Sequence, residues 1–371
     1  MRLHKKFSLN LSLFVLAVIL AVFNPGCAFI LRKPVYKAGE IQSLKTYRGA
    51  FHIHSNFSHD SHATLQTIQN TAKKAKLDFA VITDHNNSLA RDVYAGMDEP
   101  AGPLLIFGTE ISTGDGHLIA LGVRETPPSD LMSGQAAIDW VRKKGGQAIL
   151  AHPICDKNPW DDLSVKGFSG LEVYNFAHSF YRPNKVLLAT KILLLPPKTF
   201  LRSFYRAPEQ SLALWDEKLR TGQYAAFGGT DAHIKAKILG FSPESFMMNL
   251  QSVTMLVRSE ALKPENITEA LVKGRSFIAF EVFGDAQDFS FEASANKKIF
   301  SMGDSIKSRE PVTLSVKIPE DGDMRLIYQG KVIAGSKGRE LSYMVSAAGA
   351  YRAEVYKKGK LWILSNPIYL K

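Results

Sequence analysis

The strongest constraint on the fold is a series of seven short apolar segments, five of which run into a stretch that contains Asp, Glu or His. These segments are Gly49–His54, Phe79–Thr83, Leu104–Phe107, His117–Val123, Gln147–Ala151, Gly170–Tyr174 and Tyr224–Gly228. Apolar residues at helical spacing lie between them, at Leu65–Ala75, Gln135–Lys144 and Leu212–Thr221. Strands that alternate with helices predict an α/β fold with parallel strands. If the strands close into a βα barrel, their carboxyl ends build the active site. The polar residues at these ends are therefore expected to meet at one mouth of the barrel.

The residues at these strand ends are imidazoles and carboxylates, with no thiolate among them. His52 and His54 are separated by one residue, and alternation along a strand would place both rings on the same side. Asp231 and His233 repeat that spacing. The other candidate ligands are His59, Asp60, His85, Glu110, His117 and His152. Such a set favours Zn, Mn or Fe in a catalytic site with several metals over a structural zinc.

Each of these short patterns is weak by itself. An isolated pair of histidines is more often solvated or hydrogen-bonded than bound to a metal. A capped strand end with a satisfied ring would explain one histidine, but it does not explain why nearly every strand end carries such a residue. His4, His62 and His178 lie outside the pattern and are given no role.

Six motifs carry a resemblance to a known family. FHIHSNFSHDS, VITDHN, GTEIS, HLIALG, ILAHP and GGTDAH occur in this order within roughly residues 47–285. In this combination they resemble the motifs of the PHP (polymerase and histidinol phosphatase) family. The resemblance implies a distorted (β/α)7 TIM-like barrel, two or three divalent metal ions, and phosphoesterase activity in most members. It also implies metal ligands at His52, His54, His85, Glu110 as a bridging carboxylate, His117, His152, Asp231 and His233.

Two assignments within the predicted site stay open. The family places an Asp or His ligand after the first pair of histidines, and both His59 and Asp60 are available here, with a slight preference for Asp60. Asp84 is a candidate either for a ligand or for a residue that orients a histidine from behind.

The pattern of residues 1–30 predicts a signal peptide or a membrane anchor. Basic residues precede the apolar stretch Phe7–Phe23, whose 17 residues are at the short limit of a membrane span. Gly26-Cys27 resembles the end of a bacterial lipoprotein signal, so a lipidated Cys27, a cleaved signal and an uncleaved anchor stay open. The basic start should remain in the cytoplasm, which places the barrel outside it, in the cell envelope.

The net charge and the cysteine content exclude few classes of partner or fold. The net charge of +11 is compatible with nucleic acid, an anionic membrane or an anionic substrate, and part of the excess lies in the N-terminal segment. Another part lies in residues 178–208, a basic and apolar stretch that would lie on a membrane, cover the active site or pack on the barrel. Two cysteines, Cys27 and Cys155, exclude a disulfide framework.

The composition changes near residue 286. Short alternating runs predict an antiparallel β-sandwich over residues 286–371, after a barrel over residues 45–285. Predicted turns separate the runs, among them Glu320-Asp321-Gly322 and Gly335–Gly338. No cluster of catalytic residue types occurs in this part, which is expected to be structural or a binding accessory.

These observations predict a metal-dependent phosphoesterase outside the cytoplasm. A metal-bridging hydroxide would attack phosphorus, Glu110 would hold the metals, and Asp231 or His233 would protonate the leaving group. The expected substrate is a phosphorylated small molecule or an envelope-derived compound, and export argues against nucleic acid. The alternatives are a non-catalytic metal- or ligand-binding envelope module and a metal-dependent hydrolase of a non-phosphate ester or amide.

Overall fold

The structure is a computed structural model. It describes residues 44–371, except 97–101, 130–132, 181–190, 192–193, 204 and 235–245. The predicted signal or anchor over residues 1–30 lies outside this part of the chain. Within the described ranges, no helix has both the length and the apolar character needed to cross a membrane.

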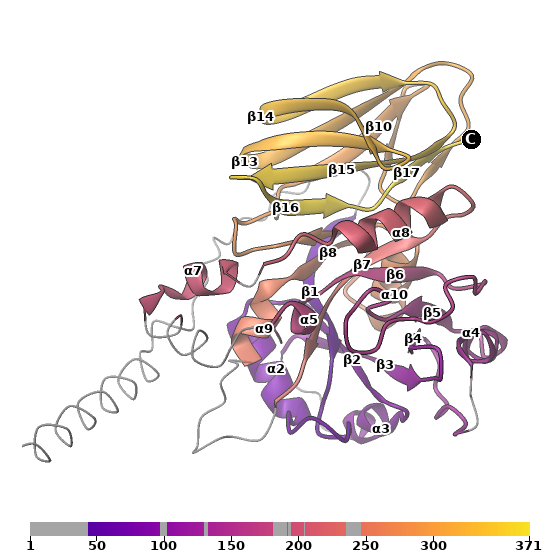
Figure 1. Cartoon of the computed structure of the whole chain (residues 1–371), viewed down its shortest axis with the longest axis vertical. Coiled ribbons are helices and arrows are strands. Elements are labelled where there is room, and N and C mark those ends of the chain that lie inside the picture. Colours follow the sequence, from indigo (N-terminus) through magenta and orange to yellow (C-terminus); the bar gives the residue numbers. More distant parts are fainter. Residues whose placement is uncertain are drawn as a thin grey trace, which may run out of the picture.

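Seven strands close into a barrel (Figure 1). They are β1 (Lys45–Ile53), β2 (Phe79–His85), β3 (Leu104–Ser112), β4 (His117–Leu121), β5 (Gln147–Leu150), β6 (Gly170–Asn175) and β7 (Ala225–Ala232). Each strand pairs with the next, and β7 pairs with β1. Both pairings of β4 are antiparallel, because this strand returns from β3 through a tight turn without a helix. The α/β prediction of a TIM-like barrel is thus confirmed as a closed seven-stranded barrel.

Helices surround this barrel (Figure 1). They are α2 (Leu65–Lys74), α3 (Leu89–Ala95), α4 (Gly134–Lys143), α5 (Phe176–Phe180), α7 (Pro197–Arg202), α8 (Glu209–Leu219), α9 (Phe246–Ser252) and α10 (Pro264–Val272). A hydroxyl caps the start of two of them: Thr64 accepts from the backbone N–H of Thr67, and Ser133 accepts from that of Ala136. The predicted apolar face of α2 is buried against the barrel.

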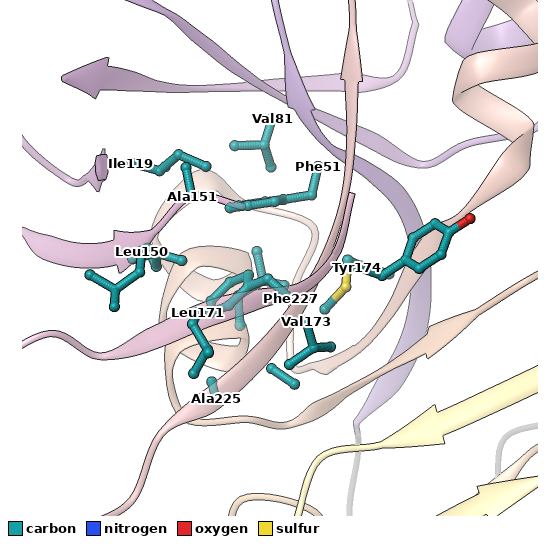
Figure 2. Close-up of a cluster of buried hydrophobic side chains, with 14 of the residues drawn as sticks. Phe51, Val81, Ile119, Leu150, Ala151, Leu171, Val173, Tyr174, Ala225 and Phe227 are labelled. Carbon is teal, nitrogen blue, oxygen red and sulfur yellow. The ribbon is translucent and has the colours of Figure 1, made fainter. Parts of the chain in front are cut away.

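Apolar side chains fill the inside of the barrel (Figure 2). The rings of Phe51 on β1 and Phe227 on β7 lie 4.9 Å apart and are fully buried. Val81 and Leu171 from two further strands belong to the same cluster. These residues precede the polar residues of their strands, so the barrel is packed with apolar side chains below the end at which the histidines gather.

A β-rich region follows the barrel and lies above it in Figure 1. Two strands lead to it, β8 (Thr254–Ser259) and β9 (Ser276–Ala279). The region contains β10 (Ser290–Ala295), β11 (Lys298–Ser301), β12 (Ser305–Ile306), β13 (Val312–Tyr328), β14 (Lys331–Val345), β15 (Gly349–Lys357), β16 (Lys360–Ser365) and β17 (Ile368–Leu370). Its apolar cluster also includes Leu256 and Phe277 from the two leading strands. The predicted boundary near residue 286 stays a prediction, because packing is continuous across it.

Two predicted turns in this region are wrong. Glu320-Asp321-Gly322 lies inside β13, and Gly335–Gly338 lies inside β14, so four predicted short strands form two long ones. The register of this pair shifts between Lys317 and Gly322, which marks an irregularity of the bulge type rather than a chain reversal. These segments are largely exposed, so charged residues and glycine are tolerated there without ending the strand.

Buried polar contacts join the C-terminal region to the barrel. The guanidinium of Arg352 on β15 donates to both carboxylate oxygens of Asp216 on α8, at 3.0 and 2.8 Å, and also to Glu354. Asn366 bonds both backbone groups of Ala226 on β7, accepting at 2.7 Å and donating at 3.2 Å. The C-terminal region therefore holds one helix and one strand of the barrel in place.

We predict that Arg352→Met destabilises the protein strongly. The change leaves two buried carboxylates without their cation, and breaking a buried ion pair in this way costs about 3–5 kcal/mol. Urea denaturation followed by circular dichroism measures the free energy of unfolding. The control is Arg339→Met, which removes an exposed contact with Asp321 and should cost no more than about 1 kcal/mol. Equal effects of the two substitutions would contradict this account.

Candidate metal centre

The backbone is strained where it delivers three of the predicted ligands. His52, His152 and Asp231 have φ angles of 65°, 30° and 49°, in a region that residues other than glycine seldom adopt. Each such residue costs on the order of 1–3 kcal/mol, and residues of this kind cluster at functional sites. The register of β1 shifts at this point against both β2 and β7. Regular alternation, from which the shared side of His52 and His54 was predicted, is therefore wrong for His52.

The two imidazoles nevertheless meet, and a carboxylate lies between them and three others. The Nε2 atoms of His52 and His54 are 3.1 Å apart, and each lies 3.1 Å from Oε2 of Glu110. His85 Nδ1 lies 3.4 Å from the same oxygen. On the other side, Oε1 of Glu110 lies 2.9 Å from His117 Nδ1 and 3.1 Å from His152 Nε2. Glu110 is buried at the end of β3, so five rings from different parts of the chain converge on one carboxylate.

Two further carboxylates extend this cluster. Asp231 Oδ1 lies 3.4 Å from His54 Nε2 and 3.6 Å from His52 Nε2. Asp60 Oδ2 lies 3.0 Å from His233 Nε2 and 3.6 Å from His85 Nε2. Among the groups that could hold an ion, four are made of histidine and carboxylate alone: His52/His54/Glu110, His52/His152/Asp231, His85/Glu110/His117 and His54/Asp60/His85/His233. The structure thus brings together every predicted ligand except His59.

The donor atoms fit divalent metal ions. Ligands at about 2.0–2.2 Å from one ion lie roughly 3.0–3.5 Å from each other, which matches most of these separations. Nδ1 of His85 and Nε2 of His233 are buried and have no hydrogen-bond partner among the described residues, although a carboxylate oxygen lies near each. Each of these nitrogens lies close to a carboxylate oxygen, but the geometry does not suit a hydrogen bond. The two atoms are therefore suited to bind one metal ion together.

The structure favours Asp60 over His59 at the ambiguous position. Burial alone would raise the pKa of Asp60, but contacts with His233 and His85 hold it well below its usual range. His59 is exposed, and its ring centroid lies 5.0 Å from that of His85. Among the described residues, no group of candidate ligands includes His59.

The electrostatics of the cluster favour cations at its centre. Burial would raise the pKa of Glu110, but the charge of His52 and hydrogen bonds from His117 and His152 hold it well below its usual range. Burial would lower the pKa of the histidines, yet Asp231 and Glu110 raise that of His54 to about 9. Hydrogen bonds with Cys155 and Glu110 raise the pKa of His152 to about 10. The same negative charge favours divalent ions in place of these protons, so metal affinity should rise with pH.

Glu172 on β6 orients two of the ligands, and the sequence analysis missed it. Its Oε1 lies 2.8 Å from His52 Nδ1, and its Oε2 accepts from the backbone N–H of His152 at 2.9 Å. Asn175 donates to the second oxygen at 3.1 Å. A carboxylate behind a metal-binding imidazole fixes the direction of the ring. The only signal in the sequence was an acidic residue in an otherwise apolar strand.

Asp84 contacts the residue after His54 rather than a histidine ring. Its two oxygens accept from the backbone N–H and the hydroxyl of Ser55, at 2.6 and 2.5 Å. It belongs to none of the candidate ligand groups of the described residues. The carboxylate therefore fixes the backbone directly after His54 through Ser55. The ring of His54 is met instead by Ser58, whose Oγ lies 3.1 Å from Nδ1.

Cys155 and His178 also reach the centre, contrary to the sequence analysis. Cys155 Sγ lies 3.7 Å from His152 Nδ1, and the ring of His178 on α5 lies 4.6 Å from that of His152. Burial would raise the pKa of the Cys155 thiol, but hydrogen bonds from the two histidines lower it to about 5. A sulfur atom therefore lies beside the imidazoles of the centre, although the sequence analysis found no thiolate among the strand-end residues.

A polar pocket of about 310 Å³ opens beside this edge of the centre. Its lining includes His152, Cys155, His178, Asn175, Arg206 and Gln210. In the basic stretch 178–208, residues 181–190 lie outside the described part, and Arg202 donates to the backbone oxygen of Val282 at 2.9 Å, away from this pocket. Of the basic residues named here from that stretch, Arg206 lines this pocket and Arg202 does not.

Comparisons with known proteins give one clear relative. No protein-family model matches the chain. An uncharacterized protein of Methanocaldococcus jannaschii is 31% identical over 162 residues, which are 40% of this chain and 94% of the relative. The chain belongs to the same family as this archaeal protein.

Two solved structures are similar at lower levels. One is a two-domain protein of Bacteroides vulgatus that contains a predicted PHP-like metal-dependent phosphoesterase. It is 16% identical, with a TM-score of 0.46, over 91% of this chain and 100% of that protein. The other is an amidohydrolase of Chromobacterium violaceum with bound sulfate and no metal, 15% identical with a TM-score of 0.33, over 50% of this chain and 87% of the other.

We predict that Glu172→Gln weakens metal binding without preventing folding. The amide keeps the shape of the side chain but loses the charge that orients His52, and such a loss typically lowers affinity about 10–100-fold. Competition with a chromogenic chelator measures the affinity. Glu217→Gln on the exposed side of α8 is the matched control, because the Glu217 side chain is 68% exposed. An unchanged affinity in Glu172→Gln would show that the contact with His52 does not support the centre.

Proposed function

We propose that the chain is a PHP-type metal-dependent phosphoesterase whose barrel lies outside the cytoplasm. The observation that carries this proposal is the buried carboxylate of Glu110 with imidazole nitrogens on both of its oxygens, at 2.9–3.4 Å. This arrangement, extended by Asp60 and Asp231, suits two or three divalent ions of manganese, zinc or iron. The order of the six motifs supports the same family.

The residues of the chain would prepare the site for an anionic substrate. When bound, divalent ions would neutralise charge on a phosphoryl group and activate water. Glu172 holds the ring of His52 in one direction, so that Nε2 faces the mouth. The adjacent pocket offers Arg206 and Gln210 to the part of the substrate that leaves. A phosphorylated small molecule of modest size is the substrate class that this pocket suits.

The predicted acid roles of Asp231 and His233 stay predictions. Burial would raise the pKa of Asp231, but His52, His54 and His233 hold it well below its usual range. This carboxylate is therefore better suited to binding a cation than to donating a proton. His233 Nδ1 donates to the backbone oxygen of Asp231 at 2.9 Å, which leaves Nε2 directed towards Asp60.

We predict that Glu110→Gln lowers phosphoester turnover at least about 10²-fold, the scale expected for a positioned catalytic group. The amide loses the charge that both sides of the centre share. A panel of phosphomonoesters, phosphodiesters, amides and lactones, assayed with Mn²⁺, Zn²⁺ or Fe²⁺, gives the turnover, and elemental analysis gives the metal content. Normal turnover in Glu110→Gln with all metals retained would overturn the mechanism.

Two arginine substitutions accompany this experiment, and the second of them is the control. Arg206→Ala should raise KM more than it lowers kcat, because this residue lines the pocket. Arg202→Ala should change neither constant, because its guanidinium contacts Val282. If the panel shows hydrolysis of amides or lactones alone, the substrate class is wrong. If it shows no hydrolysis while two or more metals are bound, a non-catalytic binding module is the better explanation.

Export of the barrel is a separate proposal. It is supported by the basic start and the apolar stretch Phe7–Phe23, which lie outside the described residues. We predict that reporters fused after residue 40 are active on the far side of the membrane. Activity restricted to the cytoplasm would contradict this. Loss of a fatty-acid label in Cys27→Ser would identify a lipoprotein, whereas an unlabelled wild-type chain would leave a cleaved signal or an uncleaved anchor.

A further inference from the structure

His152 stands between two groups of metal-binding atoms with different chemistry. Its Nε2 lies 3.1 Å from Glu110 and thus belongs to the nitrogen and oxygen ligands of the centre. Its Nδ1 faces the other way, 3.7 Å from the sulfur of Cys155. His178 completes this second group, since one donor atom from each of the three residues lies within 4.8 Å of the others.

The dimensions of the second group suit one ion. Zinc binds sulfur at about 2.3 Å and imidazole nitrogen at about 2.0–2.1 Å, so the two atoms lie roughly 3.6 Å apart in a tetrahedral site. The distance between Cys155 Sγ and His152 Nδ1 is 3.7 Å. Asp231 Oδ2 lies 3.8 Å from Nε2 of His178, so a carboxylate charge also lies close to this group.

We propose that Cys155, His178 and Nδ1 of His152 form a further metal position, selective for a thiophilic divalent ion such as Zn²⁺. Sulfur favours such ions over Mn²⁺, which prefers oxygen. Three protein ligands leave a fourth position, and the pocket of about 310 Å³ beside these residues gives access to it. The position goes beyond the proposed phosphoesterase, whose ligands are histidine and carboxylate alone.

The arrangement has a consequence for His152. A neutral ring binds a metal through one nitrogen and carries a proton on the other. An ion at the sulfur side would therefore compete with the Glu110 side for this ring, unless the neutral ring also loses its one remaining N–H proton and bridges the two ions. In the competing case, excess Zn²⁺ would draw His152 away from the main centre.

Cobalt gives a test with a spectroscopic readout. The full chain is stripped with a chelator and titrated with Co²⁺, whose bond to a thiolate produces a charge-transfer band in the near ultraviolet. We predict that the wild type shows this band. Cys155→Ser should lose the band and should bind one equivalent of Co²⁺ fewer than the wild type. Cys27→Ser is the matched control, because the chain has two cysteines, and it should keep the band. His178→Asn should weaken binding in the titration of this band at least about tenfold.

The outcomes separate the proposal from its alternatives. A wild-type chain that is saturated with Co²⁺ but shows no thiolate band would overturn it, and Cys155 would then serve as a hydrogen-bond acceptor for His152. Retention of every equivalent of Co²⁺ in Cys155→Ser would overturn it as well. The Co²⁺ that remains bound in Cys155→Ser reports that the variant is folded. The charge-transfer band and the number of bound Co²⁺ ions are measured without substrate. They therefore test this metal position even if the chain hydrolyses no phosphoester.

Discussion

The buried carboxylate of Glu110 is the interaction on which the rest of the site depends. An ionised carboxylate in a protein interior is unfavourable unless cations and hydrogen bonds compensate it. Here five imidazoles compensate it, and they come from β1, β2, β4 and the segment after β5. Delivery of these rings explains the left-handed backbone at His52 and His152, since regular strands would direct the rings elsewhere.

The architecture around the carboxylate supports this arrangement from two sides. Apolar residues such as Phe51 and Phe227 fill the barrel below the mouth, so the carboxylate lies above a closely packed apolar interior. On the other side, Glu172 braces His52 and the backbone of His152 through a single side chain. The C-terminal region acts at longer range, because Arg352 holds Asp216 on α8, the helix whose first residues line the pocket.

Much of the site could be predicted because the topology of a barrel brings strand ends together regardless of local detail. The prediction for His52 and His54 illustrates this: the alternation argument fails at His52, yet the two rings meet. Between Asp60 and His59 the sequence supported only a slight preference for Asp60, since the choice depends on how one loop turns. Cys155 and His178 were missed because they follow strands in a loop and a short helix, with no repeated spacing. The long strands β13 and β14 were missed because glycine in an exposed strand resembles a turn.

The strain at the mouth and the charge within it point to a link between metal binding and folding. Three left-handed residues cost on the order of 1–3 kcal/mol each, and the clustered imidazoles repel one another when protonated. Divalent ions would remove those protons and draw the same donor atoms inward, so their binding would offset both costs. The unfolded chain lacks the assembled ligands, and binding to the folded state alone would stabilise it by mass action. The geometry that weakens the isolated barrel is therefore the geometry that metals would stabilise.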